Sequence, residues 1–165
     1  MSNRRMPAQK PGKSEQAVCT PPEFLSAVVN MFGDLDFDLA ALETNRVYGL
    51  PYFGPDHPAE ECRDGLAATW PYQGLAWCNP PFGNIQPWAE TCARVSTLTA
   101  LHTLMLVPAS VGANWYRDYV APFADVYSIG RLTFVGHSNP TPKDLILCHY
   151  WRLGGQKFTH WAWRK

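Results

Sequence analysis

Two adjacent prolines, Pro80 and Pro81, follow a short apolar run and limit the possible folds of this chain more than any other feature. Proline fixes φ and lacks a backbone N–H, so neither residue can continue the hydrogen-bond ladder of a sheet. Pro81 also restricts the residue before it to extended conformations. The stretch from Asn79 to Phe82 therefore predicts a rigid corner that ends a strand and presents one amide side chain, carbonyl groups and one aromatic ring.

Segments typical of strands and helices alternate along the rest of the chain. Apolar or alternating runs predict strands over residues 34–41, 75–78, 101–110 and 125–130. Helical spacing of apolar residues predicts helices near residues 20–33, 85–98 and 112–123. Two further strands, over residues 131–137 and 143–153, are expected to form a C-terminal antiparallel hairpin. This order predicts an α/β domain with a mainly parallel sheet.

Local signals refine the amino-terminal part of this prediction. Thr20 has the residue type of a helix N-cap, and Gly33 marks the end of the first helix. In the strand that follows, alternation places Leu35, Phe37 and Leu39 on one face.

Length and composition set broad limits on the kind of protein. The chain has 165 residues, the size of one domain, and no uninterrupted apolar run near the ~20 residues of a membrane span. Residues 1–16 carry basic side chains but no apolar segment, so we expect a flexible basic arm rather than a secretory signal, followed by a single domain over residues 17–165. Five cysteines without a CxxC pair favour reduced thiols in the cytoplasm and argue against structural zinc.

The charge balance argues against a large phosphate-binding surface. Lys and Arg number fourteen, Asp and Glu number fourteen, and the formal net charge is zero. Basic residues nevertheless gather in the first thirteen positions and again from Lys143 onwards, while acids cluster between Glu15 and Glu90. One basic and one acidic side would suit nucleic acid near the first and a polar or cationic cofactor near the second.

Acidic residues and the proline corner both come directly after predicted strands. In parallel α/β sheets, ligands bind at the carboxyl ends of the strands. Asp36, Asp38 and the corner that begins at Asn79 are therefore expected to face one crevice.

The corner and its neighbours resemble a known family. The sequence NPPF resembles the (D/N/S)PP(Y/F) motif of class I S-adenosylmethionine-dependent methyltransferases that act on amino nitrogens. With TPPEFL, FDLAALETN, WCNPPFGNIQPW, LMLVPAS and GRLTF, spread in order over residues 20–151, the chain resembles the phage-type DNA N-6-adenine methyltransferase family. The resemblance implies an abbreviated Rossmann-like class I methyltransferase fold, S-adenosylmethionine as cofactor, no metal, and double-stranded DNA with a flipped-out adenine as substrate. If phage-encoded, such a protein would act in the cytoplasm of a bacterial host.

The proposed chemistry explains the residues of the corner. Adenine N6 is a poor nucleophile because its lone pair is delocalised into the ring. The Asn79 side-chain oxygen and the Pro80 carbonyl could hold its two hydrogens and aim the lone pair at the methyl group. Phe82 would stack on the flipped base, and Pro81 would keep the acceptors fixed, so no reorganisation is needed during the reaction. These four residues are the predicted catalytic set.

The resemblance also implies cofactor contacts, each with a simpler structural interpretation. A carboxylate after a strand can accept from ribose hydroxyls, and Asp38 is the first candidate, with Asp36 as the alternative. Asp64 matches a position near the cofactor adenine, or is a turn aspartate before Gly65. Thr20 matches a segment that contacts the methionine carboxylate, or is only the helix N-cap.

The DNA-binding prediction depends on the C-terminal third of the chain. Arg131 and Lys143, with His137 between them, are expected near phosphates or bases. A glycine-rich first cofactor motif is missing, so the cofactor lobe is expected to be short.

Other interpretations of the function stay open at this point. The acceptor could be cytosine N4, RNA adenine or a protein glutamine, because each presents a planar NH₂ group. The chain could also be a non-catalytic nucleic-acid-binding module that retains the corner as a base pocket. The sequence does not predict the oligomeric state.

Overall fold

A single six-stranded sheet organises the chain. The computed structural model describes residues 18–155 and 157–164, so the predicted basic arm over residues 1–16 lies outside the described part. The strand order is β1-β2-β3-β5-β4-β6. The strands are β1 (Phe37–Asp38), β2 (Gln73–Cys78), β3 (Ala100–Pro108), β4 (Ala124–Gly130), β5 (Leu145–Tyr150) and β6 (Phe158–His160). The helices are α1 (Pro22–Phe32), α2 (Gln86–Leu98) and α3 (Asn114–Tyr119), with short 3₁₀ helices at Val47–Gly49 and Glu60–Cys62.

The sheet is mostly parallel, with one reversed strand. β1 pairs parallel with β2, β2 with β3, and β4 with β6. β5 lies between β3 and β4 and runs antiparallel to both. The mixed α/β class and the mainly parallel sheet predicted from the sequence are therefore confirmed.

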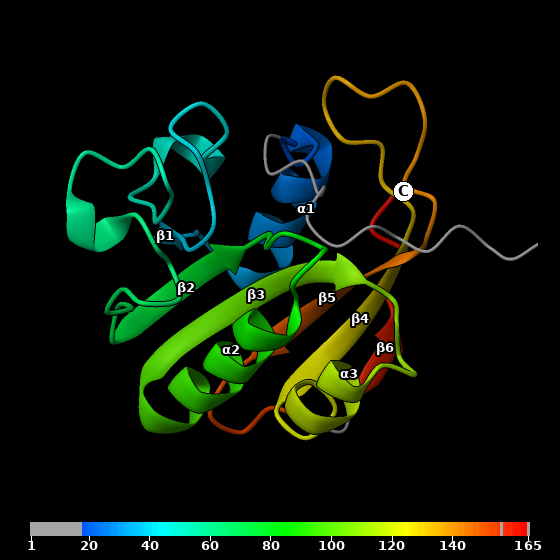
Figure 1. Ribbon diagram of the computed structural model, residues 1–165. Coiled ribbons are helices and arrows are strands. Elements are labelled where there is room, and N and C mark those ends of the chain that lie inside the picture. The colour runs from blue at the N-terminus through cyan, green and yellow to red at the C-terminus, as the bar shows by residue number, and fades with distance from the viewer. Residues whose placement is uncertain (1–17, 156, 165) are drawn as a thin grey trace, which may run out of the picture.

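Helices cover both faces of the sheet, with α1 on one side and α2 and α3 on the other (Figure 1). On the α1 side, Phe24 and Val28 pack with Trp77 of β2 in one buried cluster. On the α2 side, Trp88 and Cys92 belong to a second cluster. Strands buried on both faces carry near-continuous apolar sequence, which is why β2 and β3 were visible as short apolar runs. Among the described residues, no helix is long and apolar enough to cross a membrane.

The predicted strand over residues 131–137 does not form. Leu132 and Phe134 are buried, so their alternation resembles a strand, but this segment contributes only one isolated bridge. Gly130 and Gly136 adopt φ values of +74° and +87°, which bend the chain away from extended geometry. The antiparallel pair near the C-terminus is instead formed by β4 and β5, joined by the long segment 131–144.

The amino-terminal prediction needs two corrections. Leu35 packs on the α1 side, whereas Leu39 packs on the α2 side, so the predicted single apolar face is wrong. The strand is only two residues long because the chain turns after Asp38. Thr20 is not the N-cap of α1: that position is Pro21, and no side chain caps the helix. Gly33 ends α1 as predicted, and its N–H donates to the Val29 carbonyl.

Two glycines allow the segment 51–65 to pack closely against the chain that leaves β1. A Cβ atom at Gly54 would overlap the Ala41 carbonyl oxygen. At Gly65 it would lie 2.5 Å from the Leu39 carbonyl oxygen. Both obstacles are backbone atoms, which cannot rotate away as a side chain can. The close approach therefore requires glycine at both positions.

We predict that Gly54→Ala lowers the free energy of unfolding by about 1–3 kcal/mol or more, because the added methyl overlaps backbone. Gly112→Ala is the matched control, since a Cβ there meets no atom within 4 Å and φ is not in the left-handed region. Urea denaturation followed by circular dichroism measures both variants. Equal stability of the two variants would contradict the close approach.

Candidate functional site

Two adjoining cavities lie where the chain leaves β1 and β2. The larger has a volume of about 190 Å³ and is partly open to solvent. Its walls include Phe53, Trp88, Arg63 and Asp64. The smaller has a volume of only about 10 Å³, about the space of one water molecule, and is lined by residues that include Thr20 and Asp38. Ala40 and Asn79 line both cavities, so the two adjoin at the proline corner.

Asn79 lies at the junction of the two cavities, and its side-chain oxygen accepts no hydrogen bond from the described residues. It directly follows Cys78, the last residue of β2, and is partly exposed. Within the described part of the chain, neither its side-chain oxygen nor the Pro80 carbonyl accepts a hydrogen bond. Pro80 is buried and Pro81 lines the larger cavity. The corner therefore presents two acceptors on a backbone whose flexibility is reduced by two prolines.

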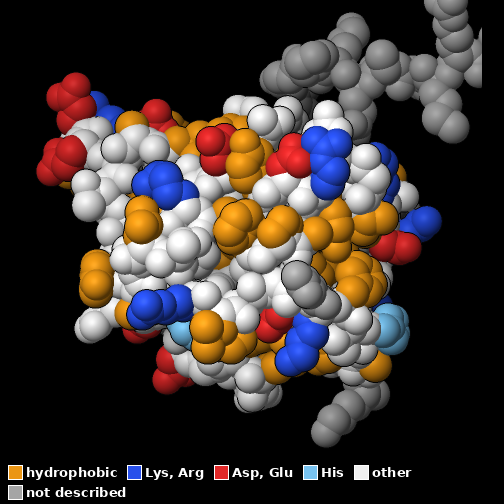
Figure 2. Space-filling model, turned by 90° about the horizontal axis from the view of Figure 1, so that it is seen from below, with side chains coloured by type: hydrophobic (Ala, Val, Ile, Leu, Met, Phe, Trp, Pro, Cys, Tyr) orange, Lys and Arg blue, Asp and Glu red, His pale blue; other side chains and the backbone are white. Residues whose placement is uncertain are grey.

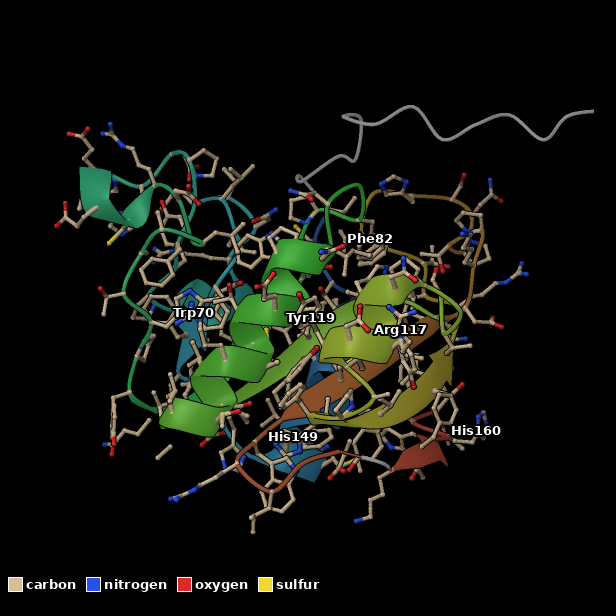
Figure 3. The ribbon with its side chains drawn as sticks, turned by 60° about the horizontal axis from the view of Figure 1, so that its bottom comes forward. Trp70, Phe82, Arg117, Tyr119, His149 and His160 are labelled. Atoms are coloured by element: carbon tan, nitrogen blue, oxygen red, sulfur yellow. The ribbon has the colours of Figure 1, made fainter. Side chains whose placement is uncertain are left out.

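Phe82 is half-buried at the amino end of α2 (Figure 3). Its ring packs against Phe134 with centroids 6.5 Å apart and planes inclined by 60°. This contact joins the proline corner to the segment 131–144. Phe82 and Pro80 line neither of the two cavities, so they border the site from outside.

Asp38 is a buried carboxylate, with only 2% of its surface exposed. Its two oxygens accept from the Val47 N–H at 3.0 Å and the Ala40 N–H at 3.3 Å. Burial raises the pKa of Asp38 from 3.8 to about 6, although these two hydrogen bonds oppose the shift. Each carboxylate oxygen can accept two hydrogen bonds, so capacity remains for a ligand in the smaller cavity.

Asp36 has a structural contact instead. Its Oδ2 accepts from the Leu75 N–H at 2.8 Å, near the start of β2. The side chain is exposed and lines neither cavity. Of the two acids left open by the sequence, only Asp38 reaches the predicted crevice.

Thr20 and Asp64 lie on opposite sides of the site. Thr20 is buried beside Asp38 and Asn79 in the smaller cavity, and its hydroxyl has no hydrogen-bond partner among the described residues. Asp64 lines the larger cavity, and its Oδ1 also accepts from the Leu66 N–H at 3.0 Å. Both interpretations of Asp64, turn residue and cavity residue, are therefore compatible with its position.

The predicted DNA contacts lie apart from the cavities, on the segment 131–144. Arg131 approaches Asp144 at 3.6 Å, and both side chains are more than half exposed. Lys143 is exposed on the same segment. Figure 2 shows the opposite end of the molecule, seen from below, where basic side chains are scattered among hydrophobic ones and form no continuous stripe in that view.

Sequence reasoning missed the wall of the larger cavity. Phe53 and Trp88 supply its aromatic surface, and Arg63 is held at its rim by hydrogen bonds to the His57 and Pro58 carbonyls, at 2.9 and 3.2 Å. The only signal in the sequence was the pair of glycines in the loop 51–65. No group of three His, Cys, Asp or Glu side chains in the described ranges could hold a metal ion.

Comparison with known families identifies the chain. The family model for DNA N-6-adenine-methyltransferase (Dam) matches residues 9–145, which is most of the sequence. The chain therefore belongs to the DNA N-6-adenine-methyltransferase family, as its motifs predicted, and this family membership implies methyl transfer to adenine N6 in DNA as its general activity. A search of curated proteins and a search of solved structures found no match.

The raised pKa of Asp38 predicts a specific pH dependence of stability. The folded state favours the protonated carboxyl of Asp38. The contribution of this group to the free energy of unfolding is therefore fully present below pH about 4 and is lost as the pH rises through about 6. The shift corresponds to roughly 3 kcal/mol. Asp38→Asn removes the ionisation, so the variant should gain stability relative to wild type between pH 4 and pH 7. Urea denaturation across this range measures the difference, and a pH-independent difference would contradict the assignment.

Proposed function

We propose that this chain transfers a methyl group from S-adenosylmethionine to N6 of an adenine flipped out of DNA. The observation that carries the proposal is the junction at Asn79, where an unused side-chain acceptor on a proline-stiffened corner adjoins both cavities. Family membership supplies the reaction class, and the positions of Asn79 and Asp38 support the roles proposed for them.

The side chains that line the two cavities match the chemical groups of the cofactor. Asp38 keeps acceptor capacity for the ribose hydroxyls, and its burial strengthens hydrogen bonds to it. Phe53 and Trp88 offer apolar surface for an adenine ring, with Asp64 beside them. The Thr20 hydroxyl is available to form a hydrogen bond with the amino-acid end of S-adenosylmethionine. When bound, S-adenosylmethionine supplies an electrophilic methyl group on a positively charged sulfur.

The proline corner orients the acceptor amine. Asn79 Oδ1 and the Pro80 carbonyl each accept a hydrogen bond from one N6–H group. These two hydrogen bonds direct the nitrogen lone pair towards the cavity junction. Because the corner is rigid, these acceptors are already in place when positive charge develops on the nitrogen. Phe82 offers an aromatic face to the extruded base, whose extraction costs a few kcal/mol.

The sheet supports an abbreviated Rossmann-like class I methyltransferase fold as part of this proposal. Its parallel strands β1 and β2 end at the site, as ligand-binding α/β sheets do. Gly54 and Gly65 allow the segment 51–65 to pack closely against the chain after β1, where both glycines line the larger cavity. Arg131 and Lys143 would contact the DNA from the segment 131–144.

Asn79→Ala should abolish methyl transfer while leaving affinity for S-adenosylmethionine within about twofold, because the lost acceptor acts on the amine. Transfer is measured with methyl-labelled S-adenosylmethionine and unmethylated DNA, followed by mass spectrometry of the nucleosides. Calorimetry measures cofactor affinity.

Asn30→Ala, on an exposed position of α1, is the matched control and should retain full transfer. N6-methyladenine from wild type but not from Asn79→Ala supports the proposal. Product in RNA, cytosine or glutamine instead would change the acceptor, and an Asn79→Ala variant as active as wild type would refute the orienting role.

Asp38→Ala should weaken S-adenosylmethionine binding by about 10- to 150-fold, the equivalent of losing one charged hydrogen-bond acceptor. Asp36→Ala should leave binding unchanged and lower stability instead, because its carboxylate only caps the Leu75 N–H. Calorimetry with S-adenosylmethionine and urea denaturation separate the two effects. The reverse pattern would assign the ribose to Asp36.

A further inference from the structure

One exposed apolar side chain stands at a sharply turned position beside the site. The His137 N–H donates to the Phe134 carbonyl at 3.0 Å, and Gly136 has φ +87°, which suits the third position of a type II turn. Val135 therefore occupies the corner of the turn, where 52% of its surface is exposed.

Single exposed apolar residues are common on proteins, so exposure alone means little. Val135 differs because both of its flanks are fixed. Its N–H donates to the Cys19 carbonyl at 3.0 Å, in an isolated antiparallel bridge between these two residues. The preceding Phe134 is buried in the α1-side core, with 7% of its surface exposed. The backbone on both sides of Val135 is therefore held in place while the valine side chain is exposed to solvent.

The contacts of Phe134 and Cys19 also connect the turn to the candidate site. The ring of Phe134 contacts that of Phe82, whose role in the proposed function is to stack on the base. Cys19 directly precedes Thr20, which lines the smaller cavity with Asp38. In Figure 1 the segment 131–144 extends past the carboxyl end of β4, on the side of the molecule that also holds the end of β2.

Extraction of a base leaves a gap in the stacked duplex that an exposed apolar side chain can fill. An adenine leaving the duplex breaks its stacking and leaves a gap between its neighbours, and apolar side chains inserted at base steps offset this cost. Valine has few rotamers in extended backbone, so holding it in the gap costs little conformational entropy. Arg131 and Lys143 lie on the same segment and are exposed, and Arg131 also approaches Asp144 at 3.6 Å.

We propose that Val135 enters the DNA at the target site and fills the space left by the extruded adenine. This inference rests on the proposed function, because it assumes that adenine in a duplex is the substrate. It makes Val135 a positioning residue: it does not touch the reacting atoms but stabilises the state in which adenine has left the stack.

The test compares one substitution on two DNA substrates. Sites methylated by wild type are first identified by sequencing, and duplexes are made with the target adenine opposite thymine or opposite an abasic site. On the paired duplex, Val135→Ala should lower kcat/KM about tenfold, because extraction is less well compensated. On the abasic duplex, where the adenine is already unpaired, the variant should be within about twofold of wild type.

Two control variants complete the design. Val135→Ile keeps a β-branched apolar side chain and should retain activity on the paired duplex. Leu153→Ala removes another exposed aliphatic side chain, one with 77% of its surface exposed, and should behave as wild type on both substrates. Circular dichroism confirms that each variant is folded.

The outcomes separate this inference from the proposed function. Equal loss by Val135→Ala on both duplexes, or no loss on either, would overturn the role of Val135 while leaving the methyltransferase assignment intact. If sequencing finds no adenine methylated by wild type, both the proposed function and the role of Val135 are overturned.

Discussion

The parallel pairing of β1 with β2 is the constraint on which the site depends. In its register Asp38 lies beside Trp77, so the acid ends up two residues from Asn79 along the neighbouring strand. β1 has only two residues, and its position is fixed from both sides: the Leu39 N–H donates to the Trp77 carbonyl, and the Asp38 N–H donates to the Pro51 carbonyl. A shift of one residue would turn the Asp38 side chain to the other face of the sheet and separate the acid from the proline corner.

The same pairing explains why a carboxylate is buried at a cost. Desolvation raises the pKa of Asp38, which means that its ionised form is unfavourable in the folded protein. The hydrogen bonds from Val47 and Ala40 offset part of that penalty but do not remove it. An asparagine could accept one of these bonds without the charge, so the acid is not needed for the fold. Retaining a destabilising group at a cavity is typical of functional sites, where stability is traded for binding.

The sequence predicted those parts of the structure that depend on local pattern. The helix α2 and the strand β3 follow from periodicity, and the corner at Pro80 follows from covalent geometry. The segment 131–137 was predicted wrongly because alternation reports burial, as it does for Leu132, and not which backbone will pair. The walls of the larger cavity could not be predicted, because the overlap that requires Gly54 depends on Ala41, and their contact exists only after the loop has folded back.

The segments to which cofactor binding, base orientation and base extraction are assigned in the proposed reaction are physically joined. The bridge between Cys19 and Val135 links the residues before α1 to the turn at the tip of the segment 131–144. Phe134 links that turn to Phe82, and so to the proline corner. Because these contacts already hold the segments together, cofactor and DNA would in the proposed reaction meet a site that needs little rearrangement.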